Sequence, residues 1–350
     1  MQSNGKCDLN IKDKVGKGFA AVKQISQMLS DLCLGPYLYE AFTVLRSSLF
    51  LSSLLANSEA WVGLTKKNIS DLEAVDLQLL RSVFSSDLTK HSRTPKELLY
   101  LETGTIPIRF TLMSRRLNFL WYLLNQNEDS MLSQFFHAQC DSPTRGDWVS
   151  SVKQDLEDLE LNTTFEQIKD CTKEAFKDTV KKHVKAAALK MLTKSQQTHS
   201  KSSSLKYNEL KMQGYLSSEG NFMTNKEKKF AFTVRSHMLQ LKGNFKEGKS
   251  EIQCSLGCDN VEDQKHIFDC PELKDDEEDY DNELLSYEDI YGNDKDKIRR
   301  ITQRLMERFG KLTTIVNRQS KPCSATAENI TDDDIDIVNL SNVSVVDLDL

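Results

Sequence analysis

SDLEAVDLQLLRSV, residues 70–83, is the stretch that decides the fold class. Its apolar residues return at every third or fourth position, which is the period of an α-helix and not the period of two expected for a strand. They are Leu72, Val75, Leu79, Leu80 and Val83. Ser70 and Glu73 have the spacing of a capping box, in which each side chain bonds the other residue's backbone amide at a helix start. The stretch therefore predicts an amphipathic helix with one face on a core.

The same period recurs along most of the chain, so we predict a mainly α protein built as a multi-helix bundle. Capping-box spacing is also found at Thr94 with Glu97, Thr164 with Gln167, and Thr224 with Glu227. Further helices are predicted over residues 18–32, 37–56, 107–125, 129–138, 148–159, 172–194, 226–241 and 295–312.

Two breaks in the helical pattern divide the chain. Residues 140–147 contain Pro143 and Gly146, and residues 195–204 have no apolar residue. We expect a flexible N-terminus at 1–15, a helical domain at 16–140, a basic helical domain at 148–242, a small cysteine-containing subdomain at 250–272, an acidic linker at 273–293, a terminal helix at 294–312 and a disordered acidic tail at 313–350.

Composition predicts an intracellular protein of the nucleus or cytoplasm. The chain has 350 residues, of which 39% are apolar and 28% charged. Its most apolar stretch, residues 41–64, is interrupted by Arg46 and Glu59, so no membrane span or membrane partner is expected. The first 19 residues lack the apolar core of a secretory signal. We therefore expect a protein that is not secreted and whose eight cysteines are reduced.

A cysteine and histidine cluster predicts a metal site. Cys254, Cys258, His266 and Cys270 supply three thiols and one imidazole, the ligand number of a closed tetrahedral zinc site. His266 and Cys270 lie four apart, so one helical turn places both on one face, and Gly257 permits a tight turn between the first two cysteines. Four protein ligands leave no position for a reacting water, so the Zn²⁺ would be structural. The alternative is a set of ordinary buried cysteines.

A lysine-rich segment points to a polyanionic partner. The formal net charge is only −6, but residues 181–250 hold 15 Lys and Arg against 4 Asp and Glu. We select Lys181, Lys182, Lys185, Lys190, Lys226, Lys228, Lys229 and Arg235 as candidate contacts to RNA or DNA. On the helix predicted at 172–194, these lysines lie away from an apolar stripe of Phe176, Val180, Val184, Ala187 and Met191. The alternative is that the lysines only solvate helix faces and are neutralised by the acidic residues that follow.

A second basic group precedes an aromatic run. Arg115 and Arg116 are the exposed candidates there for nucleic-acid contact, whereas Trp121 and Tyr122 are predicted to pack in the core. No catalytic pattern accompanies these groups. The aspartate pairs, residues 275–276 and 332–334, lie in acidic runs and not on an apolar hairpin that could hold two metal ions. We therefore expect no enzymatic activity.

Three blocks resemble the region downstream of the catalytic core in non-LTR (LINE-type) retrotransposon reverse transcriptases. They are LRSSLFLSSLLANSEAWVGLTKKNISDLEAVDLQLLRSVF (residues 45–84), TPKELLYLETGTIPIRFTLMSRRLNFLWYLLNQ (residues 94–126) and the cysteine cluster (residues 254–270). The resemblance covers roughly residues 16–310. It implies a thumb-like domain at 16–140, a linker domain at 148–242 and a zinc knuckle at 250–272 that assists nucleic-acid contact.

This resemblance does not extend to catalysis. The sequence contains no segment similar to the fingers, the palm with its Asp-Asp motif, or an endonuclease domain. The resemblance implies that Cys254, Cys258, His266 and Cys270 are metal ligands. It departs from the family's pattern in that three residues separate the first two cysteines where two are commoner. We therefore expect a nucleic-acid-binding remnant of a reverse transcriptase, without polymerase activity.

The acidic tail suggests a rival function as a protein-interaction scaffold. Two short apolar groups flanked by aspartates resemble SUMO-interacting motifs, which add a strand to the edge of a sheet. They are Ile335, Ile337 and Val338, then Val343, Val345 and Val346. A tail with incidental apolar residues remains the alternative.

Overall fold

The computed structural model is mainly helical, as predicted. It describes residues 7–32, 34–84, 94–142, 144, 146–198, 204–219, 223–245, 252–274 and 285–319. Among these residues there is no strand, only two isolated bridges, Thr103 with Met212 and Gln253 with Val261. No helix in these ranges combines the length and the apolar character needed to cross a membrane.

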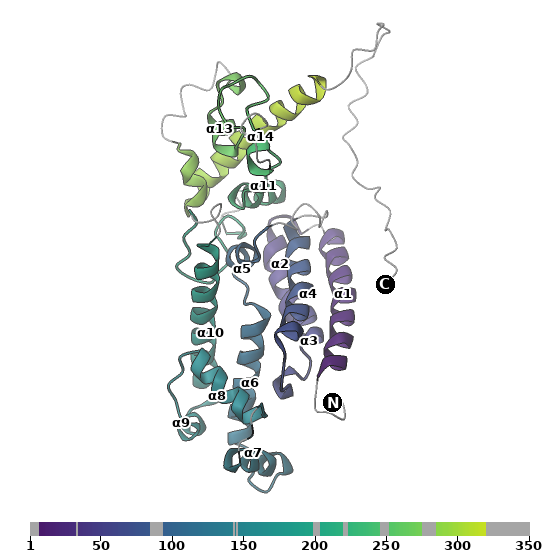
Figure 1. The fold of residues 1–350 in the computed structure, drawn as a ribbon, viewed down its shortest axis with the longest axis vertical. Coiled ribbons are helices and arrows are strands. Elements are labelled where there is room, and N and C mark those ends of the chain that lie inside the picture. Colours follow the sequence, from purple (N-terminus) through teal and green to yellow (C-terminus); the bar gives the residue numbers. More distant parts are fainter. Residues whose placement is uncertain are drawn as a thin grey trace.

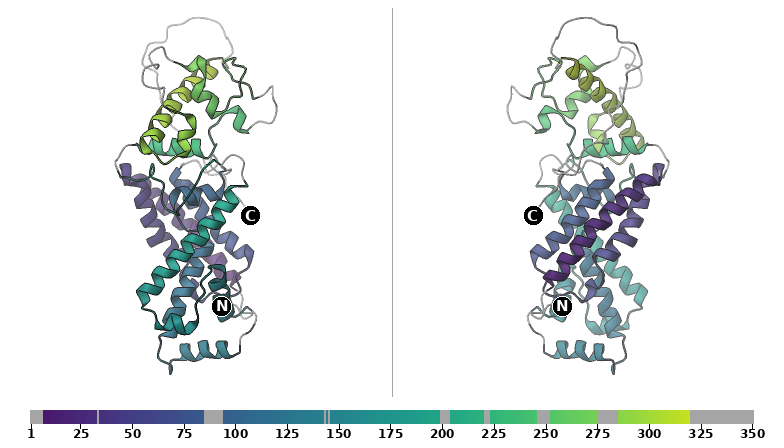
Figure 2. Two further views of the ribbon diagram at one scale, coloured as in Figure 1. Left: turned by 90° about the vertical axis from the view of Figure 1, so that its left-hand side faces the viewer. Right: turned by 90° about the vertical axis from the view of Figure 1, so that its right-hand side faces the viewer.

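Helices α1 to α10 form a bundle, and the later helices form a C-terminal lobe above it (Figure 1). The bundle comprises α1 (Asp8–Asp31), η1 (Gly35–Tyr37), α2 (Leu38–Leu45), the π-helical turn η2 (Arg46–Phe50), α3 (Leu51–Leu54), η3 (Ser58–Ala60), α4 (Lys66–Phe84), α5 (Lys96–Thr103), α6 (Ile108–Leu124), α7 (Met131–Asp141), α8 (Trp148–Asp158), α9 (Phe165–Asp170) and α10 (Lys173–Gln196). Helices α1 and α10 cross opposite faces of the bundle (Figure 2).

The helix predicted from residues 70–83 is α4, and its apolar face is buried against α1 and α6. All five apolar residues of that face are no more than 2% exposed. Gly18 allows α1 to approach, because a Cβ at this position would lie 2.9 Å from side-chain atoms of Leu54 and Val75. The predicted start of α4 was wrong. The helix begins at Lys66, where Thr65 and Asn68 exchange side-chain to backbone hydrogen bonds.

Helix α10 packs along α6 and α5. Its buried stripe is Phe176, Val180, Val184, Ala188 and Leu192. The predicted stripe was therefore wrong at Ala187, which is half-buried, and at Met191, which is exposed. Residues four apart remain on the contact line with the neighbouring helices, whereas the step of three shifts away from it.

The segment 204–219 is held against the end of α5. Gly104 has φ +67°, and a Cβ there would lie 2.1 Å from the backbone of Lys211 and Met212, so only glycine fits this approach. The backbone amide of Gln213 donates to the carbonyl of Glu102 at 2.9 Å. This contact joins the bundle to the segment that leads into the C-terminal lobe.

The lobe is organised around its last helix. It comprises α11 (Asn225–Arg235), α12 (Lys242–Phe245), α13 (Gln264–Asp269), η5 (Pro271–Leu273), η7 (Tyr287–Tyr291) and α14 (Lys295–Gln319). Helix α14 contacts α11, α13 and η7. It buries Ile298, Ile301 and Leu305, so the predicted terminal helix is part of the folded lobe.

Several predicted boundaries were wrong because tertiary packing extends the ordered elements. Helix α1 begins at Asp8 and buries Ile11, so residues 8–15 belong to the bundle and not to a flexible N-terminus. Tyr287 and Ile290 are buried within the predicted acidic linker. Helix α14 continues to Gln319, seven residues into the predicted tail. Residues 320–350 lie outside the described ranges.

The capping predictions had mixed outcomes. Thr164 with Gln167 and Thr224 with Glu227 form complete capping boxes at α9 and α11. The pair at Thr94 was wrong, because α5 starts one residue later with Pro95 at the cap position.

Helix α11 docks the lobe on the bundle. The ring of Phe232 stacks on that of Phe84 with centroids 3.7 Å apart. Arg235, only 2% exposed, bonds the carboxylate of Glu102 at 3.0 Å, and this carboxylate also accepts from Tyr207 at 2.6 Å. Aromatic packing and a buried ion pair therefore connect the two regions.

Candidate metal centre and nucleic-acid interface

Local backbone structure brings the four predicted ligands together. Cys254 and Cys258 lie on a tight turn in which Gly257 has φ +90°. His266 is in α13, whose first turn is capped by Asp263 through a 2.7 Å bond from the His266 amide. Cys270 follows as the C-cap residue of the same helix. The prediction that one helical turn carries His266 and Cys270 is confirmed.

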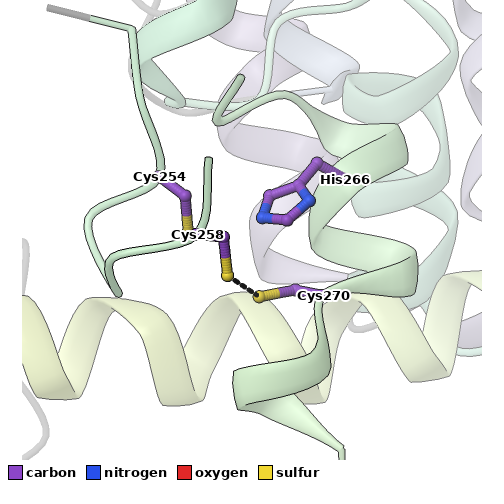
Figure 3. A group of neighbouring side chains, drawn as sticks. All are labelled: Cys254, Cys258, His266 and Cys270. Carbon is purple, nitrogen blue, oxygen red and sulfur yellow. Dashed lines mark hydrogen bonds between the residues drawn. The ribbon is translucent and has the colours of Figure 1, made fainter. Parts of the chain in front are cut away.

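The ligand atoms have separations that suit a metal ion. All four lie within 4.8 Å of one another, and the sulfur atoms of Cys258 and Cys270 are 3.6 Å apart (Figure 3). Ligands about 2.3 Å from a tetrahedral ion would be roughly 3.7 Å apart. The Nε2 atom of His266 is buried and has no hydrogen-bond partner among the described residues. The cluster could hold a metal ion.

Without a cation, this site disfavours the thiolate form of its cysteines. Burial raises the pKa of Cys270 to about 12, and the hydrogen bond between Cys270 and Cys258 adds to the shift. Burial also raises the pKa of Cys258. A bound cation acts in the opposite direction because it stabilises the ionised thiol.

Two charged residues that were not selected from the sequence support this cluster. Glu262 accepts from the amide of Ser255, inside the cysteine turn, at 2.9 Å. Arg308 is fully buried in α14 and donates to backbone carbonyls near the end of α13, including those of Phe268 and Cys270. A basic residue on the same face of the helix as Ile301 and Leu305 was the available signal for Arg308.

The lysines of α10 form an exposed row. Lys173, Lys177 and Lys181 follow one another at intervals of four residues, and Lys182 lies beside them, all exposed. Within the part of the chain that the structure describes, none of them forms an ion pair with a carboxylate. We call these four residues the lysine row.

Two further candidates on α10 are less available for contact with a phosphate. Lys185 is half-buried near Glu209, and Lys190 bonds Glu160 at 2.7 Å.

The candidates on α11 mostly face inward. Lys226 is exposed, whereas burial lowers the pKa of half-buried Lys229. The predictions for Lys228 and Arg235 were wrong. Lys228 is 1% exposed and donates to the carbonyls of Pro36, Leu216 and Ser217, while Arg235 pairs with Glu102. Buried cations with these partners cannot reach a phosphate.

The basic group on α6 was also misplaced. Arg115 is half-buried and donates to the carbonyls of Leu55 and Leu51, and Arg116 is only 9% exposed. Neither is therefore an exposed contact. Trp121 is half-buried and donates its Nε1–H to Cys171, but Tyr122 is 46% exposed, so its predicted place in the core was wrong.

Comparisons with known proteins add no assignment. No family model matches the chain, and no curated protein or solved structure is significantly similar to it. The six apolar residues proposed for SUMO contact and the two aspartate runs lie outside the described residues.

Proposed function

We propose that this chain binds nucleic acid without catalysis, through the lysine row of α10, and that a structural Zn²⁺ holds its C-terminal lobe. The resemblance to the thumb, linker and knuckle of non-LTR reverse transcriptases, stated above from the sequence, motivates the same proposal. The observation that carries it is the lysine row, a set of exposed cations with no carboxylate partner among the described residues.

The spacing of the row favours a polyanion. Residues four apart on a helix rise by about 6 Å, so Lys173, Lys177 and Lys181 form a line of charges along one face. Like charges at this spacing destabilise an isolated helix. A phosphate backbone would relieve the repulsion and release its counterions on binding. Lysine side chains recognise phosphate rather than bases, so this contact would not depend on sequence.

Zinc is the ion that best suits the cluster. Three thiols and one imidazole match the preferred ligands of Zn²⁺, and four protein ligands leave no position for a reacting water. Cys254, Cys258, His266 and Cys270 would hold the ion. Its contribution would be to stabilise a lobe whose helices α12 and α13 are too short to form a core alone.

Fluorescence anisotropy with single-stranded RNA and DNA, titrated between 50 and 200 mM salt, tests the binding function. Reversing two charges of the row, K177E/K181E, should weaken binding at least about tenfold and reduce the salt slope by roughly two. The matched control is K12E/K23E, which reverses two exposed lysines of α1, the helix that crosses the opposite face of the bundle from α10. Absence of binding at 50 mM salt, or equal losses in both variants, would overturn the proposal.

A further inference from the structure

A cavity lies where helix α11 of the lobe meets the bundle. Its volume is about 800 Å³, within the range of small-molecule sites, which often lie between two structural units. Helices α1, α2 and α4 line it on the bundle side, and α11 contributes Asn225 and Lys229. The side-chain amide of Asn225 donates to the carbonyl of Gly35 at 2.6 Å and so fixes this end of α11 beside the bundle.

Much of the cavity wall is apolar. Four of the six apolar lining residues are buried, whereas Phe19 is 43% exposed. A ligand with an apolar body would cover wall surface that otherwise faces water, which is favourable. The apolar lining residues are Phe19, Val22, Leu29, Leu34, Leu38 and Val83.

The charged groups of this cavity are cations. Its described lining includes Lys23 and Lys229 but no aspartate or glutamate. Lys23 is exposed, whereas Lys229 is half-buried. Burial lowers the pKa of Lys229, and no carboxylate among the described residues counteracts this shift. A partly desolvated ammonium without a counter-ion is stabilised by an anion, because a nearby opposite charge favours its charged form.

An apolar wall beside one half-buried ammonium suits a ligand with a single negative charge on an apolar body. A carboxylate can accept a charge-assisted hydrogen bond from the ammonium. A phosphate ester would bring nearly two negative charges, and a sugar would place hydroxyl groups against apolar wall, where they lose hydrogen bonds to water. A fatty acid of about ten carbons has the required charge and apolar body, and it fits a cavity of this size.

We propose that this cavity binds a monocarboxylate with an apolar chain, such as a medium-chain fatty acid. Lys229 pairs with the carboxylate, and the apolar side chains of the bundle hold the chain. Because Lys229 belongs to the lobe, the bound molecule connects the two regions. The site shares no residue with the lysine row or the cysteine cluster, so it is independent of the proposed nucleic-acid function.

Isothermal titration of the full chain with decanoate, decanol and acetate at pH 7 tests the two parts of the site. Decanoate should bind at least about tenfold more tightly than decanol, because only the carboxylate pairs with the ammonium. Acetate, which lacks the chain, should not bind at millimolar concentration. From hexanoate to decanoate, each added CH₂ group should tighten binding about fourfold.

Two variants with matched controls locate the ligand. Lys229→Met removes the ammonium, so it should weaken decanoate about tenfold and leave decanol unchanged. Its control, K226M, removes an exposed lysine of the same helix. Ser26→Trp places a large ring in the cavity from a half-buried lining position, so it should weaken both ligands about tenfold. Its control, Q24W, lies at an exposed position of α1 outside the lining and should weaken neither.

Three results would overturn the proposal. They are no binding of decanoate at millimolar concentration, affinity for decanoate equal to that for decanol, and equal losses in a variant and its matched control. Circular dichroism checks that S26W is folded. If it is not, K229M decides, because it changes a half-buried side chain that forms no ion pair among the described residues.

Discussion

The bundle and the C-terminal lobe are stabilised in different ways. The bundle packs long helices through wide apolar faces, as α1 does on α4 and α10 on α6. The lobe contains one long helix, α14, around which short elements gather. Its cysteine cluster is held by backbone turns and by Arg308 bonds to carbonyl oxygens. Wide apolar faces therefore stabilise the bundle, whereas the lobe has a cluster that could hold a metal ion, which we propose completes it.

Buried charges are used differently in the two regions. In the bundle, Arg46 makes two 2.7 Å bonds to the carboxylate of Asp76, which also accepts from Tyr100. In the lobe, Arg308 bonds backbone carbonyls and so fixes the position of α13. At the junction, Arg235 reaches Glu102 of the bundle. The Arg46–Asp76 pair connects elements within the bundle, Arg308 connects α14 to α13 within the lobe, and Arg235 connects the lobe to the bundle.

Removing the metal should separate the two regions most clearly. We expect chelation, or C254S/H266A, to unfold the lobe, since metal binding contributes on the order of 10 kcal/mol to such sites. All three tryptophans, Trp61, Trp121 and Trp148, precede the lobe, so their fluorescence reports on the bundle. The tryptophan transition should persist but shift to lower denaturant, because the unfolded lobe no longer supplies Arg235 to Glu102, while amide exchange in α13 accelerates.

The control for metal removal is Cys171→Ser, which changes an exposed cysteine outside the cluster. It should retain one metal ion per chain, measured by atomic emission. Protected α13 amides in metal-free protein would show that the lobe has a sufficient core of its own.

Breaking the junction should have the next largest effect. Arg235→Met leaves the carboxylate of Glu102 buried without its cation, and the loss of one partner from a buried pair costs about 3–5 kcal/mol. Denaturant unfolding followed by tryptophan fluorescence and by far-UV circular dichroism should then give two transitions in place of coincident ones. Arg109→Met, which removes an exposed partner of Asp158, should cost about 1 kcal/mol or less. Coincident curves for R235M would mean that this pair does not couple the regions.

The smallest effect concerns pH and is confined to the bundle. Burial raises the pKa of Asp155 from 3.8 to about 6, outweighing the attraction of Arg116. The folded state thus binds the proton more tightly than the unfolded chain. This contribution to stability is present below about pH 4 and is lost as pH rises through 6, a change of at most about 3 kcal/mol.

Asp155→Asn removes that dependence. The unfolding free energy of D155N relative to the unmodified protein should therefore rise between pH 4 and 7, as measured by denaturant titrations at several pH values. A constant difference across this range would show that Asp155 titrates normally in the folded protein.

Sequence patterns predicted the parts of this molecule that depend on near neighbours. Three features follow from spacings within a few helical turns. They are the buried face of α4, the capping boxes at Thr164 and Thr224, and the cluster of Cys254 with Cys258, His266 and Cys270. The predicted helix boundaries were less accurate. Helix α1, for example, begins before its predicted start because Ile11 is buried in the core. Local pattern cannot report such a distant contact.

The sequence by itself determined the helical period of the apolar residues and the order of the four predicted metal ligands. Both are properties of residues close together along the chain. Only the tertiary structure decided which charged side chains are exposed and which are buried. Lys228 and Arg235 are basic, like the residues of the exposed lysine row, yet both are buried by contacts with residues far away in the chain. Arg116 and Asp155 likewise meet only because α6 packs on α8. The exposure of a charge depends on what folds over it, and that is a property of packing.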